Sequence, residues 1–319
     1  MSHKLLLAAC CLLAACQQLP EPTPAASPAT SALAALRVRY GAQPQYFSYN
    51  PQRVDVFRTA GGGALATGSQ AFLTIAGNIP APGPLQLEVR EVRTRADMVL
   101  SGLPSMAQGA VLESGGHYLV QASTASHQLL WLSPQVKLGL AVSTSPRLSS
   151  PYGLAVYAPT QPGSPTGQWQ PSADTASSVY PSTPLAATDP VYLRCLIGKG
   201  LYDSNSGWLS FARPLYTPYP PATVRVHLSE AAAAADNSAV YLVFRDYNAV
   251  AQLTPLGQGD YELANVPGQA AITVFALYGA GPKLYLGQQA DTVRAGQRLL
   301  VPLHEHTAEE VAAAARLLD

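Results

Sequence analysis

LQLEVR, residues 85–90, is a stretch in which every second side chain is apolar. Neighbouring side chains of an extended strand point to opposite faces, so the three apolar residues share one face and the three polar residues share the other. This pattern predicts a half-buried antiparallel strand. VYLVF, residues 240–244, is instead a continuous apolar and β-branched run, which predicts a strand buried on both faces.

Similar short runs, separated by turns that contain Gly and Pro, fill residues 37–150 and 221–303. We therefore expect an all-β chain with two antiparallel β-sandwich modules. Residues 151–220 are rich in Pro and Ser and contain several Tyr and Trp residues, so they are interpreted as a connecting segment. TAEE at residues 307–310 is a capping box, and it predicts a short C-terminal helix within residues 304–319.

The composition gives no support to nucleic-acid binding. The chain of 319 residues is 48% hydrophobic, enough for a sizeable core, and only 12% charged, about half the usual ~25%. Lys and Arg together number 19, as do Asp and Glu, and the basic residues are scattered rather than gathered into a stripe. No net charge is present that would attract a polyanion.

The first residues have the pattern of a lipoprotein leader. Residues 1–15 begin with a basic residue, continue with an apolar run that is too short to span a membrane, and end with small residues. Cys16 ends the lipobox LAAC at residues 13–16. We expect Cys16 to be lipidated and residues 16–36, rich in Pro and Ala, to form a flexible linker. A similar LAAC ends at Cys10 but leaves too short an apolar run, and an ordinary secretory leader is the remaining alternative.

The leader also predicts where the protein is located. Gln17 follows Cys16 in a position where residues other than Asp direct lipoproteins to the outer membrane. We therefore expect a lipid-anchored protein of the cell envelope, at the outer membrane. Whether it faces the periplasm or the cell surface is left open.

Two groups of residues carry resemblances to known families. AGGG at 60–63, LEVREV at 87–92 and ADMVLSG at 96–102 resemble a family of exported bacterial lipoproteins of unknown role, whose first domain is similar to the ZU5 β-sandwich. GDYELANVPG at 259–268 resembles a step in transthyretin-like β-sandwiches of the peptidase-regulatory type. Some ZU5-related domains cleave themselves at a His-aromatic-Ser step. Leu119 stands in the place of that Ser, after His117 and Tyr118, so we expect no self-cleavage.

The candidate binding residues are aromatic. Tyr157, Trp169 and Trp208 lie in the segment between the predicted modules, and exposed rings of this kind would bind a glycan or a protein. The favoured interpretation, however, is that they fill the interface between the modules. Cys195 is flanked by apolar residues and is expected to be a buried thiol.

No catalytic, metal or cofactor site is predicted. His304 and His306 share a strand face but lack a nearby third ligand, so a solvated turn is the favoured interpretation. Asp203 begins a sequence that resembles a calcium loop but lacks its later acidic ligands, which favours a simple turn.

We therefore expect a non-enzymatic envelope protein that acts as a structural or binding module. Its partners would be the membrane, through Cys16, and an envelope protein or glycan. One alternative is a glycan-binding accessory lipoprotein that uses exposed Tyr and Trp residues. A more distant one is a hydrolase with carboxylates contributed by separate strands.

Overall fold

Residues 85–90 form most of strand β5 (Leu85–Val92) in the computed structural model, which describes residues 31–161, 168–182, 192–204, 207–229 and 237–319. Leu85, Leu87 and Val89 are buried while the polar residues between them are half-buried, as the alternation predicts. Within the described residues the chain is all-β, with two antiparallel sandwiches and a short C-terminal helix. The predicted fold class is confirmed.

The first sandwich has two sheets with one apolar core between them. In one sheet the strand order is β1-β5-β7-β14-β10-β11, and β6 pairs with β7. In the other the order is β12-β13-β9-β3-β2, and a small β4-β8 pair accompanies them. The strands are β1 (Gln45–Tyr49), β2 (Asp55–Arg58), β3 (Ala64–Thr67), β4 (Phe72–Thr74), β6 (Met106–Ala107), β7 (Ala110–Ser123), β8 (Leu130–Leu132), β9 (Leu138–Ser143), β10 (Ala155–Pro159), β11 (Trp169–Pro171), β12 (Ser178–Pro181), β13 (Tyr192–Ile197) and β14 (Trp208–Pro214).

The segment 151–220, predicted as a connection, belongs largely to this first sandwich. Strand β14 pairs with β7 along seven residues, and β13 pairs with β9 along six. Where the structure describes this segment, proline is found at strand ends, a position compatible with Pro because it cannot donate to a central ladder. Four strands of the segment end on proline: Pro159, Pro171, Pro181 and Pro214.

The second sandwich covers most of the predicted second module. Its sheets have the orders β18-β19-β15-β22 and β17-β16-β20-β21-β23, and a second apolar core lies between them. Strand β15 runs parallel to β22, an exception to the antiparallel pattern. The strands are β15 (Ala222–Leu228), β16 (Ser238–Phe244), β17 (Val250–Gln252), β18 (Thr254–Gly257), β19 (Asp260–Val266), β20 (Ala271–Ala280), β21 (Lys283–Thr292), β22 (Gln297–Val301) and β23 (His304–His306).

The step LANVPG ends β19 for a steric reason. Asn265 has a φ of 56°, in the left-handed region that Asn tolerates better than most residues. A Cβ on Gly268 would lie 2.2 Å from the backbone oxygen of Pro220, so the two chain segments approach closely only with glycine there.

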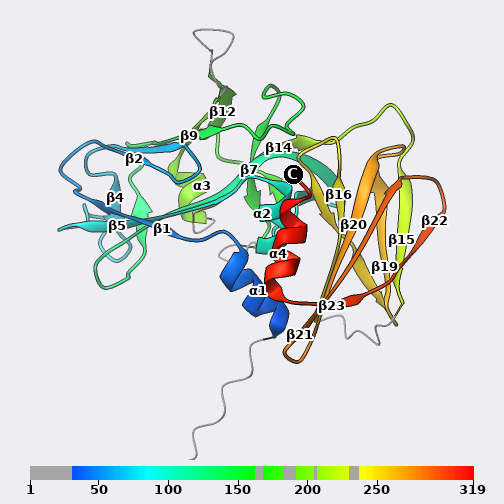
Figure 1. Ribbon diagram of the computed structural model, residues 1–319. Helices are drawn as coiled ribbons and strands as arrows, with labels where there is room; N and C mark the ends of the chain where they lie inside the picture. The colour runs from blue at the N-terminus through cyan, green and yellow to red at the C-terminus, as the bar shows by residue number, and fades with distance from the viewer. Residues whose placement is uncertain (1–30, 162–167, 183–191, 205–206, 230–236) are drawn as a thin grey trace, which may run out of the picture. The chain divides into compact units, whose positions relative to one another are not determined.

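Helices cover the outer face of the β16-β20-β21 sheet. α1 (Ala32–Tyr40), α2 (Arg95–Ser101) and α4 (Ala308–Arg316) contribute Leu36, Met98 and Val311 to a third apolar cluster, which also holds Tyr241 and Phe275 of the sheet (Figure 1). Strand β16 is consequently buried on both faces, as residues 240–244 predict. A fourth helix, α3 (Lys199–Ser204), lies in the first sandwich. None of the helices in the described ranges is long and apolar enough to cross a membrane.

Two of these helices were not predicted. α1 begins inside the expected linker 16–36, where Ser31 caps it and the side chains of Leu33 and Leu36 are buried. α2 lies inside the first module between a Thr94–Asp97 capping box and Gly102, whose φ of 67° ends the helix. Both helices are short, and they are stabilised by packing more than by their own propensity.

The predicted capping box at the C-terminal helix is present. The Thr307 hydroxyl accepts from the Glu310 backbone N–H at 3.2 Å, and the Glu310 carboxylate accepts from the Thr307 N–H at 2.8 Å. We expect Thr307→Ala to lower the free energy of unfolding by about 1 kcal/mol, since it removes the hydroxyl that accepts from the Glu310 N–H. Urea denaturation measures the change. Thr307→Ser keeps the hydroxyl and serves as the control. Equal losses in both variants would show that the cap does not stabilise α4.

Candidate functional site

Tyr157, Trp169 and Trp208 come together, but not as an exposed surface. Tyr157 and Trp169 lie in one buried cluster with solvent-exposed fractions of 5% and 0%, and the half-buried Trp208 packs against it. The indole N–H of Trp169 donates to the Pro104 backbone oxygen at 3.0 Å. Of the two interpretations, the packed one fits Tyr157 and Trp169, whose rings are buried, and Trp208 is half-buried beside them.

A buried histidine completes this cluster. The His117 ring stacks on Trp169 with centroids 4.6 Å apart, and its Nδ1 lies 2.8 Å from the Ser210 hydroxyl oxygen. Burial lowers the pKa of His117 to about 3, and a backbone interaction with Leu103 opposes this shift. The imidazole is therefore neutral at pH 7. A histidine beside a serine hydroxyl can activate it as a nucleophile, but both residues are closed off from solvent, and the pair acts here in packing.

Cys195, the buried thiol, is where the sequence places it. Its side chain is 1% exposed in the core of the first sandwich, and burial raises the pKa of the thiol. A thiol with a raised pKa is a poor nucleophile at neutral pH. Cys16, the predicted lipidation site, lies outside the described residues.

The residues considered as metal ligands have other contacts. His304 and His306 lie on strand β23, and the Nδ1 of His306 is 3.5 Å from Glu310. Asp203 accepts from the Leu132 backbone N–H at 2.8 Å and pairs with Lys199. Among the described residues, no three His, Cys, Asp or Glu side chains are grouped as metal ligands. The remainder of the calcium-like stretch, residues 205–206, lies outside the described ranges.

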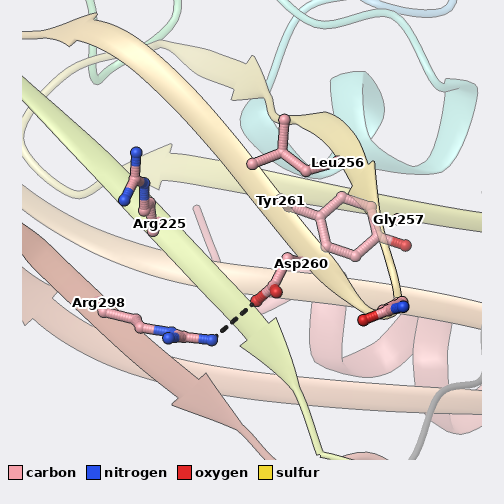
Figure 2. Close-up of a pocket in the computed structure, with 7 residues that line it drawn as sticks. Arg225, Leu256, Gly257, Asp260, Tyr261 and Arg298 are labelled. Atoms are coloured by element: carbon pink, nitrogen blue, oxygen red, sulfur yellow. Dashed lines mark hydrogen bonds and ion pairs between the residues drawn. The ribbon is translucent and has the colours of Figure 1, made fainter.

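A polar pocket of about 600 Å³ lies on the outer face of the β18-β19-β15-β22 sheet (Figure 2). Arg225 on β15 and Arg298 on β22 occupy partner positions of the parallel strand pair, so both guanidinium groups lie on the same face. Glu262, the partner of Arg225 on β19, accepts from its Nε at 2.6 Å. Leu256 and Tyr261 contribute apolar surface to the lining.

A second row of the same sheet holds Asp260. Its carboxylate lies 2.9 Å from His227 Nδ1 and 3.1 Å from Arg298 Nη2, the contact drawn in Figure 2. The hydrogen bond from His227 lowers the pKa of Asp260, and the charge of Arg298 adds to this effect. The pairs are solvent-exposed, so each contributes little to stability.

Asp260 and Glu262 lie on the same face of β19, and each carboxylate is paired with an arginine of another strand of the sheet. The pocket therefore presents fixed charges of both signs to a ligand.

The sequence contains only part of the signal for this pocket. The alternation in residues 224–229 places Arg225 and His227 on the outer face of a strand. It does not show that β22 lies next to β15, because that pairing joins distant parts of the chain.

Comparison with protein families, with curated proteins and with solved structures finds no match to this chain.

Proposed function

We propose that this chain is a non-enzymatic, lipid-anchored protein of the cell envelope that serves as a structural or binding module. Lipidation of Cys16 would attach it, with the outer membrane as the expected location. The observation that carries the proposal is the lipobox at residues 13–16, with the apolar run and small residues that precede Cys16. Acyl chains contribute about 0.8 kcal/mol for each buried CH₂ group, so several chains would hold the protein at the membrane.

The contacts of the reactive side chains support a role without catalysis. Cys195, His117 and Ser210 are packed inside the first sandwich or beside it. Glu113, another buried ionisable group, is paired with Arg213 at 2.6 Å and accepts from the Ser149 hydroxyl at 2.9 Å. Each of these groups has a structural partner, and the pocket of Figure 2 is lined by charges that solvent can reach.

The proposal extends to the families that the sequence resembles. We assign the first sandwich to a ZU5-like fold and the second to a transthyretin-like fold. The two-sandwich architecture and the steric role of Gly268 in the LANVPG step support this assignment. Fold likeness alone carries no activity over to this chain.

Replacement of the lipidated residue tests the anchor. We expect Cys16→Ala to abolish incorporation of a radiolabelled fatty acid, because the sulfur of Cys16 is the atom that would accept the lipid. The protein should then leave the membrane fraction or persist as a precursor with residues 1–15 attached. Labelling followed by membrane fractionation and intact mass measurement detects each outcome.

Cys10→Ala is the matched control, because Cys10 ends the second LAAC sequence. It should keep normal labelling and normal membrane association. Unchanged labelling of Cys16→Ala would contradict the anchor, and loss of labelling in Cys10→Ala alone would move it to Cys10.

A further inference from the structure

A second groove, of about 360 Å³, lies on the outer face of the first sandwich where strands β1, β5 and β7 run side by side. Its floor comes from these three strands, and one wall comes from the turn that follows β7. The groove is separate from the pocket of Figure 2, which is on the second sandwich. Its lining consists of Tyr46, Gln86, Glu88, Gln121, Ser123, His127 and Leu129.

The strand register arranges these side chains in two rows. Tyr46, Glu88 and Gln121 are partners across β1, β5 and β7. In the next row, Gln86 on β5 pairs with Ser123 on β7. Adjacent strands are about 4.8 Å apart, so each row presents polar groups at a regular spacing across the sheet. A rigid sheet holds such groups without the entropy cost of ordering a loop.

The groove occupies the part of the sheet face that is open to solvent. Along β7, residues 111–120 are buried on both faces, whereas burial alternates from Gln121 onward. Two apolar side chains at this open end are accessible: Tyr46 is 56% exposed and Leu129 is 43% exposed. Tyr157 and Trp169 are buried, whereas Tyr46 is an exposed tyrosine among polar side chains.

The charges of this surface balance. Glu88 is the acidic residue in the lining, and Arg90 on the same strand donates to it through Nε at 2.6 Å. The two glutamine amides can both donate and accept hydrogen bonds, as can the Ser123 hydroxyl. Groups of this kind match sugar hydroxyls, which also donate and accept. A tyrosine ring adds an apolar face for the apolar side of a sugar ring and a polar tip for its hydroxyls.

We propose that the groove on β1, β5 and β7 binds a neutral glycan chain, with Tyr46 stacking on one sugar ring and Gln86, Glu88 and Gln121 bonding to hydroxyls. This inference rests on the proposed function as a binding module and names the ligand class of that module. It needs no part of the lipid anchor. Balanced charge favours a neutral glycan over an anionic one, whereas the pocket of Figure 2 presents two arginines.

A glycan array tests this proposal with the full chain purified in mild detergent. The probes are immobilised neutral oligosaccharides and polysaccharides together with sulfated and uronic-acid glycans. We expect binding to members of the neutral set. Tyr46→Ala should weaken that binding by about tenfold, which corresponds to about 1.4 kcal/mol, because it removes the stacking ring. Tyr46→Phe should keep most of the affinity, because the ring remains.

Tyr180→Ala is the matched control. Tyr180 also lies on an edge strand of the first sandwich, β12, and is 44% exposed, but it belongs to the other sheet. It should bind as the unaltered protein does, and thermal melts should show all three variants folded.

Three outcomes would overturn the glycan site: binding to no glycan on the array, binding confined to the charged set, or neutral binding that Tyr46→Ala leaves intact. None of them affects the anchor, which lipid labelling of Cys16 tests separately.

Discussion

Trp169→Ala is expected to lower the free energy of unfolding by about 3–5 kcal/mol, the usual cost of replacing a fully buried Trp by Ala. The ring is 0% exposed and stacks on His117, and its N–H donates to the Pro104 oxygen. Truncation would leave a cavity beside a buried imidazole and an unpaired carbonyl oxygen. Chemical denaturation followed by circular dichroism measures the loss.

Two controls separate the ring from its hydrogen bond. Trp169→Phe keeps an aromatic ring against His117 but removes the N–H, so its loss should be smaller than that of Trp169→Ala. Tyr152→Ala removes an aromatic ring that is 66% exposed and should change stability by no more than about 0.5 kcal/mol. If Trp169→Ala lowered the free energy of unfolding as little as Tyr152→Ala, the Trp169 ring would be accessible to solvent. The interpretation of Trp169 as part of an exposed binding surface would then be supported.

Acid should destabilise the protein through His117. Its pKa is about 3 in the folded chain, against an ordinary value of 6.5, so the unfolded chain binds more protons between these values. Stability is therefore full above pH 6.5, falls as the pH drops below it, and levels off near pH 3. At about 1.4 kcal/mol per pH unit, this one residue should remove about 2–3 kcal/mol between pH 7.5 and pH 4.5.

The measurement is urea unfolding at pH 7.5, 6.0 and 4.5. A double variant, His117→Leu with Ser210→Ala, removes the titrating ring and the hydroxyl that would otherwise lose its partner. Carboxylates also contribute to acid unfolding, and they remain in both proteins. The unaltered protein should consequently lose about 2–3 kcal/mol more than the double variant over this range. Parallel losses would mean that His117 is protonated as easily in the folded chain as in the unfolded one.

Local patterns in the sequence predict the local structure well. Residues 85–90 and 240–244 form the half-buried and fully buried strands that their periods indicate, and Thr307 caps the last helix. In each case the burial of a side chain follows from residues within one strand or one helical turn. Helix α2 had a similar signal in Thr94, Asp97 and Gly102, which the strand-like surroundings obscured.

Amino-acid composition predicted strands and loops less well than the spacing of apolar residues did. The Pro and Ser content of residues 151–220 indicated a loop, although the segment supplies strands to both sheets of the first sandwich. Proline is excluded from the middle of a central strand but not from its end. The frequency of proline in a segment therefore does not distinguish a loop from a series of short strands. The Ala-rich start of α1 likewise has the composition of a linker, and the surface that stabilises the helix belongs largely to distant strands.

The candidate sites depend on pairings that no short stretch contains. Arg225 meets Arg298 through a parallel strand pair, and Tyr46 meets Gln121 through β5. His117 on β7 and Ser210 on β14 are partners across that strand pair, and Trp169 on β11 stacks on His117. One sequence shows which residues face outward on each strand, but the order of strands in a sheet decides which of them become neighbours.

The position of α1 has a consequence for the order in which the chain matures. α1 ends at Tyr40, yet it packs on β20 and β21, and β20 begins only at Ala271. A chain made and exported amino end first would leave uncovered the part of the α1 surface that packs on these strands until they had emerged. The described segment nearest the proposed anchor would then complete its packing late. Factors that escort unfolded chains across the envelope would have to shield it throughout that delay.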